Sequence, residues 1–254
     1  VGAGAPFVVG QPVTINPILS CRQCAACLRG EIHHCEQTAV LGVAGVPGGF
    51  AEEVVVPAYT VRALPDDLPL DAGAMTEPVA VAVRVIRSAG VQPGDRVAVL
   101  GAGNIGLLVV QAAFAVGAAV VAVTDPIASR MTVARELGAD TLVTASVGQF
   151  DAVIDGVGTP ETLALAVRLA RRGGSIAVYG VPAQEQASLP MLDLFRKDLR
   201  VAWSRLYPAD FSAAIDLLCS GRLNWQAVVT HRVGLAELPD AVNRVMADPS
   251  SGIK

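Results

Sequence analysis

The chain is poor in aromatic and charged side chains. Aromatic residues make up 4% of its 254 residues and charged residues 17%, whereas hydrophobic residues make up 52%. A core with so few rings must be built from Ala, Val, Leu and Ile. The 19 basic and 23 acidic residues give a net charge of −4, which offers neither a basic field for nucleic acid nor a polybasic patch for a membrane. The composition therefore predicts a globular protein that binds neither.

The first residues carry no export signal. The chain opens VGAGAPFVVGQPV, without a basic segment ahead of an apolar one. Together with thiols that we expect to be reduced, this predicts a cytoplasmic protein. The uncharged stretch from Val97 to Thr124 is long enough to span a bilayer, but three glycines interrupt it and Asp95 and Asp125 lie close to its ends. We interpret it as a strand, a tight turn, a buried helix and a second strand.

Four cysteines stand close together near the N-terminus. Cys21, Cys24, Cys27 and Cys35 follow the spacing C-x2-C-x2-C-x7-C. Four thiolates at this spacing can converge on one tetrahedral cation, and Zn²⁺ prefers such a soft, closed set of ligands. Because a full shell of four cysteines leaves no position for substrate, the pattern predicts a structural zinc. Paired disulfides, which the absence of export features disfavours, and an iron–sulfur cluster are the alternatives.

Strand and helix patterns alternate along most of the chain. Residues 1–60 contain short apolar pieces, such as Pro12–Ile15 and Ala51–Val56, between Pro and Gly residues, which indicates a β-rich part. Beyond it we expect strands at Val97–Leu100, Val120–Thr124, Thr141–Val143, Ala152–Asp155, Ser175–Tyr179 and Leu199–Ala202. We expect helices at Glu77–Gly90, Ile105–Val116, Ala128–Leu137, Glu161–Ala170, Phe211–Ser220 and Leu238–Ala247. Strands separated by helices of this length predict βαβ units and a parallel sheet.

A glycine motif follows the first of these strands. Gly101-Ala102-Gly103-Asn104-Ile105-Gly106 reads G-x-G-x-x-G and opens a predicted helix, which is the context that makes it a dinucleotide motif. Gly101 permits the tight turn, Gly103 lets the backbone approach a pyrophosphate, and Gly106 lets helix and strand pack closely. The phosphates would lie at the helix N-terminus, at Asn104 and Ile105, where free N–H groups favour anions. A similar turn that holds no phosphate is the alternative.

Further candidate residues follow the later strands. Asp125 stands nineteen residues after Gly106, where a carboxylate accepts the ribose hydroxyls of NAD and repels the 2′-phosphate of NADP. Arg130 is one helical turn further on, where it could contact the adenosine end or remain a solvated charge. Cofactors bind along the carboxyl edge of such a sheet. We therefore expect cofactor contacts near the nicotinamide at Val157, Tyr179, Gly180 and Val181, with ordinary strand-to-loop turns as the alternative.

The order of these motifs resembles one known family. The Cys₄ loop is followed by Gly48-Gly49-Phe50-Ala51-Glu52, by Glu77-Pro78 at a helix start, and by the glycine motif. Over nearly its whole length the chain is similar to the zinc-containing medium-chain alcohol dehydrogenases, most of all to their polyol (sorbitol) and threonine dehydrogenase branch. The resemblance implies an α/β fold, in which a Rossmann doubly wound parallel sheet is joined to a β-rich GroES-like domain. The implied boundaries are 1–78 for the GroES-like part, 79–203 for the NAD-binding domain and 204–254 for a return to the catalytic domain.

The resemblance also implies a function. It predicts a zinc-dependent oxidoreductase that transfers a hydride between an alcohol or polyol and NAD, assembled as a homodimer or homotetramer. A catalytic zinc would act as a Lewis acid on the alcohol. By this resemblance Glu77 lies at the catalytic zinc, as a ligand or a close neighbour, and Arg205 lies beside the nicotinamide cleft. A helix-start carboxylate favoured by the helix dipole is the alternative for Glu77.

The chain also departs from the family. The other catalytic zinc ligands of the family, a cysteine and a Gly-His-Glu motif, precede the Cys₄ loop, and none of His33, His34 and His231 fits that place. We therefore expect an N-terminally incomplete part of a longer enzyme, inactive by itself. Two alternatives stay open, namely a zinc-stabilised NAD-binding fragment without activity and a zinc-independent quinone or enone reductase of the same superfamily. The Cys₄ loop and Glu77-Pro78 argue against the reductase.

Overall fold

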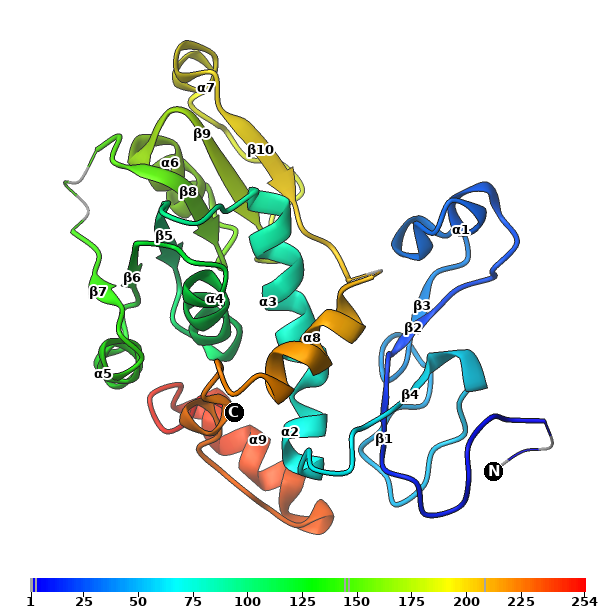
Figure 1. Cartoon of the computed structure of the whole chain (residues 1–254). Helices are drawn as coiled ribbons and strands as arrows, with labels where there is room; N and C mark the ends of the chain where they lie inside the picture. Colours follow the sequence, from blue (N-terminus) through cyan, green and yellow to red (C-terminus); the bar gives the residue numbers. More distant parts are fainter. Residues whose placement is uncertain (1, 3, 144, 146, 208) are drawn as a thin grey trace.

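A six-stranded parallel sheet forms the larger part of the molecule. The computed structural model describes residues 2, 4–143, 145, 147–207 and 209–254 (Figure 1). The spatial order of the strands is β10-β9-β8-β5-β6-β7, and every neighbouring pair is parallel. The strands are β5 (Arg96–Leu100), β6 (Val120–Thr124), β7 (Asp140–Thr141), β8 (Phe150–Asp155), β9 (Ala170–Val178) and β10 (Arg200–Trp203). This is the doubly wound order 3-2-1-4-5-6, whose direction of winding changes between β5 and β8.

Helices cover both faces of this sheet. Side chains of a strand point to alternate faces, and in β5 Val97 and Val99 join one buried core while Ala98 and Leu100 join another. The first core contains residues of α3 (Thr76–Ala89), α4 (Asn104–Ala115) and α5 (Ala128–Glu136). The second contains residues of α6 (Pro160–Leu169). The predicted doubly wound fold is confirmed.

The helices of the predicted alternation are present to within a residue or two at each end. α8 (Asp210–Cys219) packs against α3, and α9 (Leu238–Ala247) begins and ends where the sequence predicts. The sequence pattern did not predict α7 (Met191–Lys197), which is only seven residues long and has no buried residue. Within the part of the chain that the structure describes, no helix is long and apolar enough to cross a membrane.

The N-terminal part contains short antiparallel strand pairs. β1 (Val13–Ile15) pairs with β4 (Val61–Ala63), and β2 (Ile18–Leu19) pairs with β3 (Ala39–Val40). The apolar piece Ala51–Val56, which we expected to add a strand to the β-rich part, forms none. These residues make no ladder with any described strand, and Val55 is 98% exposed. Apolar alternation can indicate a strand, but a strand forms only where a neighbouring edge accepts its backbone hydrogen bonds.

Short helical turns complete the chain. α1 (Ala25–Leu28) lies within the cysteine loop, and α2 (Leu70–Ala74) immediately precedes α3. The 3₁₀ turns are Ile32–His34, Ala58–Thr60, Trp225–Val228 and Leu235–Glu237. In Figure 1 the N-terminal strands and the cysteine loop lie on one side of α3 and α8, and the parallel sheet lies on the other. The long helix α3 therefore separates the two parts of the molecule.

Candidate metal and dinucleotide sites

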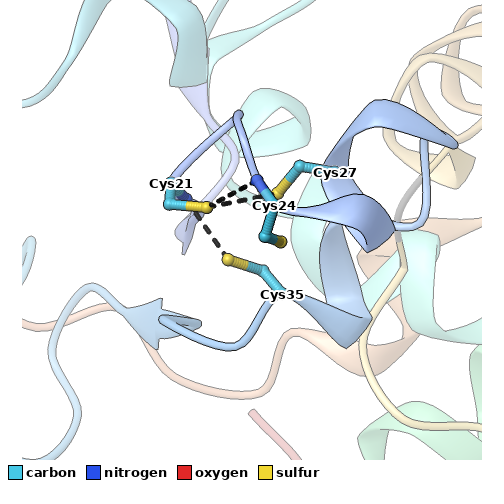
Figure 2. Close-up of side chains that lie close together, drawn as sticks. All are labelled: Cys21, Cys24, Cys27 and Cys35. Carbon is cyan, nitrogen blue, oxygen red and sulfur yellow. Dashed lines mark hydrogen bonds between the residues drawn. The ribbon is translucent and has the colours of Figure 1, made fainter.

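The four cysteines converge on one point (Figure 2). Their sulfur atoms all lie within 4.8 Å of one another, and Cys21 Sγ and Cys27 Sγ are 3.9 Å apart. A tetrahedral zinc with Zn–S bonds of about 2.3 Å requires sulfur–sulfur distances of about 3.8 Å. The side chains are therefore spaced as a Cys₄ zinc site needs them. Among the described residues this is the only group of three or more His, Cys, Asp or Glu side chains that could hold a metal ion.

Backbone N–H groups donate hydrogen bonds to two of these sulfurs. The amides of Cys21 and Gln37 each donate to Cys35 Sγ at 3.3 Å, and the amide of Cys24 donates to Cys21 Sγ at 3.3 Å. The bond from the Cys21 amide is the main cause that lowers the pKa of Cys35. Burial raises the pKa of Cys27 to about 12, and its cysteine neighbours add to this effect. Four thiolates so close together repel one another, so a divalent cation is the partner that lets all four ionise.

The glycine loop has the shape that a phosphate site requires. Gly101 has φ +100°, a conformation that L side chains rarely adopt. A Cβ on Gly106 would lie 2.9 Å from the carbonyl carbon of Gly101 and still closer to its oxygen, so the helix and the turn touch at this point. A Cβ on Gly103 would meet nothing within 4 Å. The space in front of Gly103, at the N-terminus of α4 where Asn104 and Ile105 begin the helix, is therefore open.

The Asp125 side chain is hydrogen-bonded to this glycine loop. Its Oδ2 accepts a hydrogen bond from the Ala102 amide at 2.8 Å, and its Oδ1 accepts one from the Ile127 amide at 2.9 Å. Its side chain is only 5% exposed. Each carboxylate oxygen can accept a second hydrogen bond, so Asp125 retains capacity for a ribose hydroxyl. The glycine loop and the acidic residue after β6, far apart in sequence, thus share one hydrogen-bonded surface.

Arg130 lies beside Asp125 and faces the C-terminal segment. Its Nη1 is 3.7 Å from Asp125 Oδ2, and its Nη2 donates to the Pro249 carbonyl at 3.1 Å. Its side chain is 21% exposed, so it is not a free solvated charge. The guanidinium therefore lies between the Asp125 carboxylate and the Pro249 carbonyl. Its contact with the adenosine end stays a prediction.

The loops after β8 and β9 pack closely against each other. Asp155, fully buried, accepts bonds from the Val157 and Gly158 amides at 2.9 and 3.1 Å and from Thr162 Oγ1 at 2.8 Å. A Cβ on Gly180 would lie 2.6 Å from the Gly158 nitrogen. Close packing of the two loops therefore explains why Gly158 and Gly180 are glycines, without a bound cofactor. Asp155 organises this edge of the sheet, although no short sequence motif marks it for this role.

A cavity of about 550 Å³ opens beside the loop after β9. It is bounded by α3, by the residues after β9 and by the segment between β10 and α8. It is lined by the candidate residues Glu77, Tyr179, Gly180, Val181 and Arg205 and by Trp203, whereas the candidate Val157 does not line it. Glu77 also borders a second cavity of about 630 Å³, on the side of Gly48, Gly49 and Phe50. The Glu77 carboxylate therefore lies between a cavity beside the parallel sheet and a cavity beside the N-terminal part.

The Glu77 carboxylate accepts a hydrogen bond from a tyrosine that is distant in sequence. Tyr207 is 2% exposed and donates from its hydroxyl to Glu77 Oε1 at 2.8 Å. Burial, reinforced by the charge of Glu77, raises the pKa of Tyr207, so the hydroxyl remains a neutral donor. No short motif marks this pair, because the two residues are 130 positions apart.

Arg205 makes its contact with the cysteine loop. Its Nη1 donates to the His33 carbonyl at 3.0 Å, across 172 positions of sequence. The guanidinium thus lies between the cavity and the metal loop. Among the described residues, no cysteine or histidine joins Glu77 in a metal-binding group. A single carboxylate does not make a catalytic zinc site, which takes three protein ligands.

Comparison with known proteins identifies relatives of both parts of the chain. The family described as "Zinc-binding dehydrogenase" matches residues 104–220, and the "Alcohol dehydrogenase GroES-like domain" family matches residues 1–66. The sorbitol dehydrogenase of Bacillus subtilis is 28% identical over 94% of this chain and 72% of its own length. The first curated relatives are longer than this chain, which spans 66% to 75% of their lengths.

Two solved structures show the same fold with a nucleotide bound. A zinc-binding dehydrogenase of Sinorhizobium meliloti 1021 bound to NADP is 31% identical, with a TM-score of 0.88 over 93% of this chain and 74% of that one. A short chain alcohol dehydrogenase of Escherichia coli CFT073 complexed with NADH is 30% identical, with a TM-score of 0.92 over 99% of this chain and 78% of that one. The fold therefore accommodates either form of the cofactor.

Proposed function

We propose that this chain, which belongs to the zinc-binding dehydrogenases with an alcohol dehydrogenase GroES-like domain, takes part in hydride transfer. The hydride would pass between an alcohol or polyol and NAD. The observation that carries the proposal is the cavity shared by Glu77 and the residues after β9. It adjoins the carboxyl edge of the parallel sheet, where cofactors bind in this fold. A relative named for sorbitol supports a polyol as the substrate.

The dinucleotide would lie along that edge in an extended form. Its adenosine ribose would meet Asp125, and its phosphates would meet the open N-terminus of α4 in front of Gly103. Its nicotinamide would enter the 550 Å³ cavity, beside Tyr179 and Arg205. Gly180, Val181 and Pro182, which follow β9, form one wall of that cavity. Each half of the cofactor thus has its own set of residues.

Glu77 would lie at the reacting end of the substrate. Tyr207 binds Oε1 and fixes the orientation of the carboxylate, while Oε2 remains free of any hydrogen bond from the described residues. In this family a zinc in the cleft supplies Lewis-acid chemistry to the alcohol oxygen. Glu77 could contribute one oxygen to such an ion, but the described residues alone do not hold it. We therefore assign Glu77 to the substrate side of the cleft.

Cofactor choice is tested by calorimetry. We expect NADH to bind more tightly than NADPH, because the buried Asp125 carboxylate accepts ribose hydroxyls and repels a 2′-phosphate. Asp125→Ser should narrow the difference between the two affinities. Asp193→Ser, on α7 far from the loop, removes the same charge and should leave the difference unchanged. Equal affinity of the parent protein for both cofactors would contradict the role of Asp125, and Arg130 beside it is the group that could produce that result.

Hydride transfer is tested by cofactor reduction with polyols and secondary alcohols. We expect these 254 residues by themselves to bind NADH yet to turn over negligibly, because Glu77 alone does not hold the Lewis acid that lowers the barrier by several kcal/mol. The protein with the remaining family ligands present should be active, and a chelator should abolish its activity. Robust turnover by the 254 residues that resists chelation would contradict the zinc-linked reaction. It would favour a zinc-independent quinone or enone reductase.

The edge of the sheet supports self-association. β10 has no partner on its outer side among the described strands. Trp203 of β10 is 53% exposed, and the neighbouring helix α7 exposes Met191, Leu192 and Phe195. We propose that this surface joins two copies, in a homodimer or as half of a homotetramer. We also propose a cytoplasmic location, because cysteines stay reduced there. Light scattering should give a dimer or tetramer for the parent and a smaller particle for Phe195→Asp.

A further inference from the structure

One short segment connects the metal loop to the candidate cleft. Residues 203–207 lead from the end of β10 toward α8. Within it, Arg205 Nη1 donates to the His33 carbonyl at 3.0 Å and Tyr207 donates to Glu77 at 2.8 Å. The amide of Ser204 also donates to the Val178 carbonyl at 2.8 Å, which fixes the start of the segment on β9. The segment is therefore bonded to the sheet, the metal loop and the cleft.

The backbone of this segment is held in an unfavourable conformation. Leu206, between the two side-chain contacts, has φ +56°. A left-handed conformation costs a residue other than glycine free energy, and it persists where the surroundings fix the chain on both sides. The contacts of Arg205 and Tyr207 are the restraints on either side of Leu206. Loss of one restraint should therefore release the other.

The carbonyl that binds Arg205 depends on the folded metal loop. His33 is 7% exposed and its ring lies against His34, with centroids 3.9 Å apart. It stands in the turn Ile32–His34, where the amide of Cys35 donates to the Ile32 carbonyl at 3.1 Å. Cys35 is one of the four sulfur ligands. Metal binding at a site of this kind supplies the folding free energy of its loop, so zinc determines where the His33 carbonyl lies.

We propose that the Cys₄ zinc loop positions Arg205 for the nicotinamide half of the cofactor, so that loading the structural metal strengthens dinucleotide binding. This rests on the proposed function of the cavity. The guanidinium has five N–H donors in a fixed plane, and only one of them is engaged by His33. With Nη1 held, the remaining donors and the positive charge are presented at the cavity that Arg205 lines. Without the zinc, Arg205 would lose its only hydrogen bond among the described residues.

The effect should be confined to one half of the ligand. Arg205 follows β10, whereas the glycine loop and Asp125 follow β5 and β6. β9 and β8 lie between β10 and β5 in the sheet. AMP would occupy only the adenosine half, which lies beyond the reach of Arg205. Metal loading should therefore change the affinity for NADH and leave the affinity for AMP nearly unchanged.

A thermodynamic cycle tests the coupling. NADH and AMP affinities are measured for the parent and for Arg205→Ala, each with zinc bound and after removal of zinc under reducing conditions. In the parent, zinc removal should weaken NADH binding about tenfold, which corresponds to the loss of one charge-assisted hydrogen bond. In Arg205→Ala the same treatment should change it less than about twofold. Arg200→Ala, an exposed arginine on β10, is the matched control and should keep the tenfold effect.

Two further measurements keep the test decisive if the stripped protein unfolds. With zinc in place, Arg205→Ala should itself weaken NADH binding about tenfold without changing AMP binding, and Arg205→Lys should restore part of the loss. Hydrogen exchange should show faster exchange in residues 203–207 after zinc removal, while β5 and β6 keep their protection.

Each outcome separates the inference from the proposed function. NADH binding that is equal with and without zinc would overturn the coupling and leave the dehydrogenase assignment standing. An equal loss for NADH and AMP would show that zinc stabilises the whole chain, which also overturns the coupling. A zinc-loaded parent that binds no NADH at all would overturn the proposed function, and the inference with it.

Discussion

Two glycines of one loop should respond differently to alanine. Gly103 caps the N-terminus of α4, and a Cβ there would meet nothing within 4 Å. A Cβ on Gly106 would lie 2.9 Å from the Gly101 carbonyl carbon, which is closer than real Cβ contacts come. If phosphates bind in front of Gly103, both substitutions should weaken NADH binding. Only Gly106→Ala should also strain the protein itself.

The magnitudes follow from these contacts. Gly103→Ala costs the free energy of replacing a glycine cap by alanine, about 0.5–1 kcal/mol. For a chain of this size, that lowers Tm by about 1–4 °C at 2–4 °C per kcal/mol. Gly106→Ala forces the helix away from the turn, at the cost of overpacking a core, about 1–3 kcal/mol or about 2–12 °C. In the complex, the methyl group of Gly103→Ala would occupy the space through which the pyrophosphate approaches the backbone, so the phosphates would lose hydrogen bonds to the N–H groups of α4 and the NADH affinity would fall.

Thermal unfolding and NADH titration of both variants are the assay. We expect Gly103→Ala to keep a Tm near that of the parent and to lose most of its NADH affinity. Gly106→Ala should lose both stability and affinity. If Gly103→Ala binds NADH as the parent does, the phosphates do not approach this loop, and the glycine motif would be a structural turn alone.

Three further outcomes are expected. Cys35→Ser should reduce the zinc content from one ion per chain toward zero by elemental analysis, since serine is a poor fourth ligand, and full retention of zinc would contradict the Cys₄ site. Tyr207→Phe removes the hydrogen bond to Glu77; because water can partly replace it, we expect a loss of about 1–2 kcal/mol, seen as a Tm lower by about 2–8 °C. For Asp151, burial raises the pKa, but hydrogen bonds from a backbone N–H and from Arg171 outweigh it and the pKa is lowered. This stability is present above the unfolded pKa of about 4 and is lost as the pH falls through the folded value, so Asp151→Asn should lower Tm at pH 7 and the difference should vanish in acid.

Local sequence patterns were sufficient for the parallel sheet and its helices. β5, β6 and α4 are formed by continuous apolar runs bounded by glycines and charges, and such runs are typical of strands covered on both faces. The Cys₄ loop was predictable for a similar reason, because its four ligands lie within fifteen residues and need little fold around them. The predicted strand at Ala51–Val56 failed because strand formation depends on a partner edge, which the local pattern does not contain.

The sequence by itself thus determined the alternation of strands and helices, the cysteine cluster and the glycine loop, since each is encoded by residues that are neighbours in the chain. Only the tertiary structure decided how the cleft is built. It brought Tyr207 to Glu77 and Arg205 to His33, across 130 and 172 positions. It also placed Asp125 to accept a hydrogen bond from the Ala102 amide, and Arg130 to donate one to the Pro249 carbonyl. The physical reason is that hydrogen bonds between distant residues depend on how helices and strands pack, and side chains that meet in this way leave no spacing in the sequence.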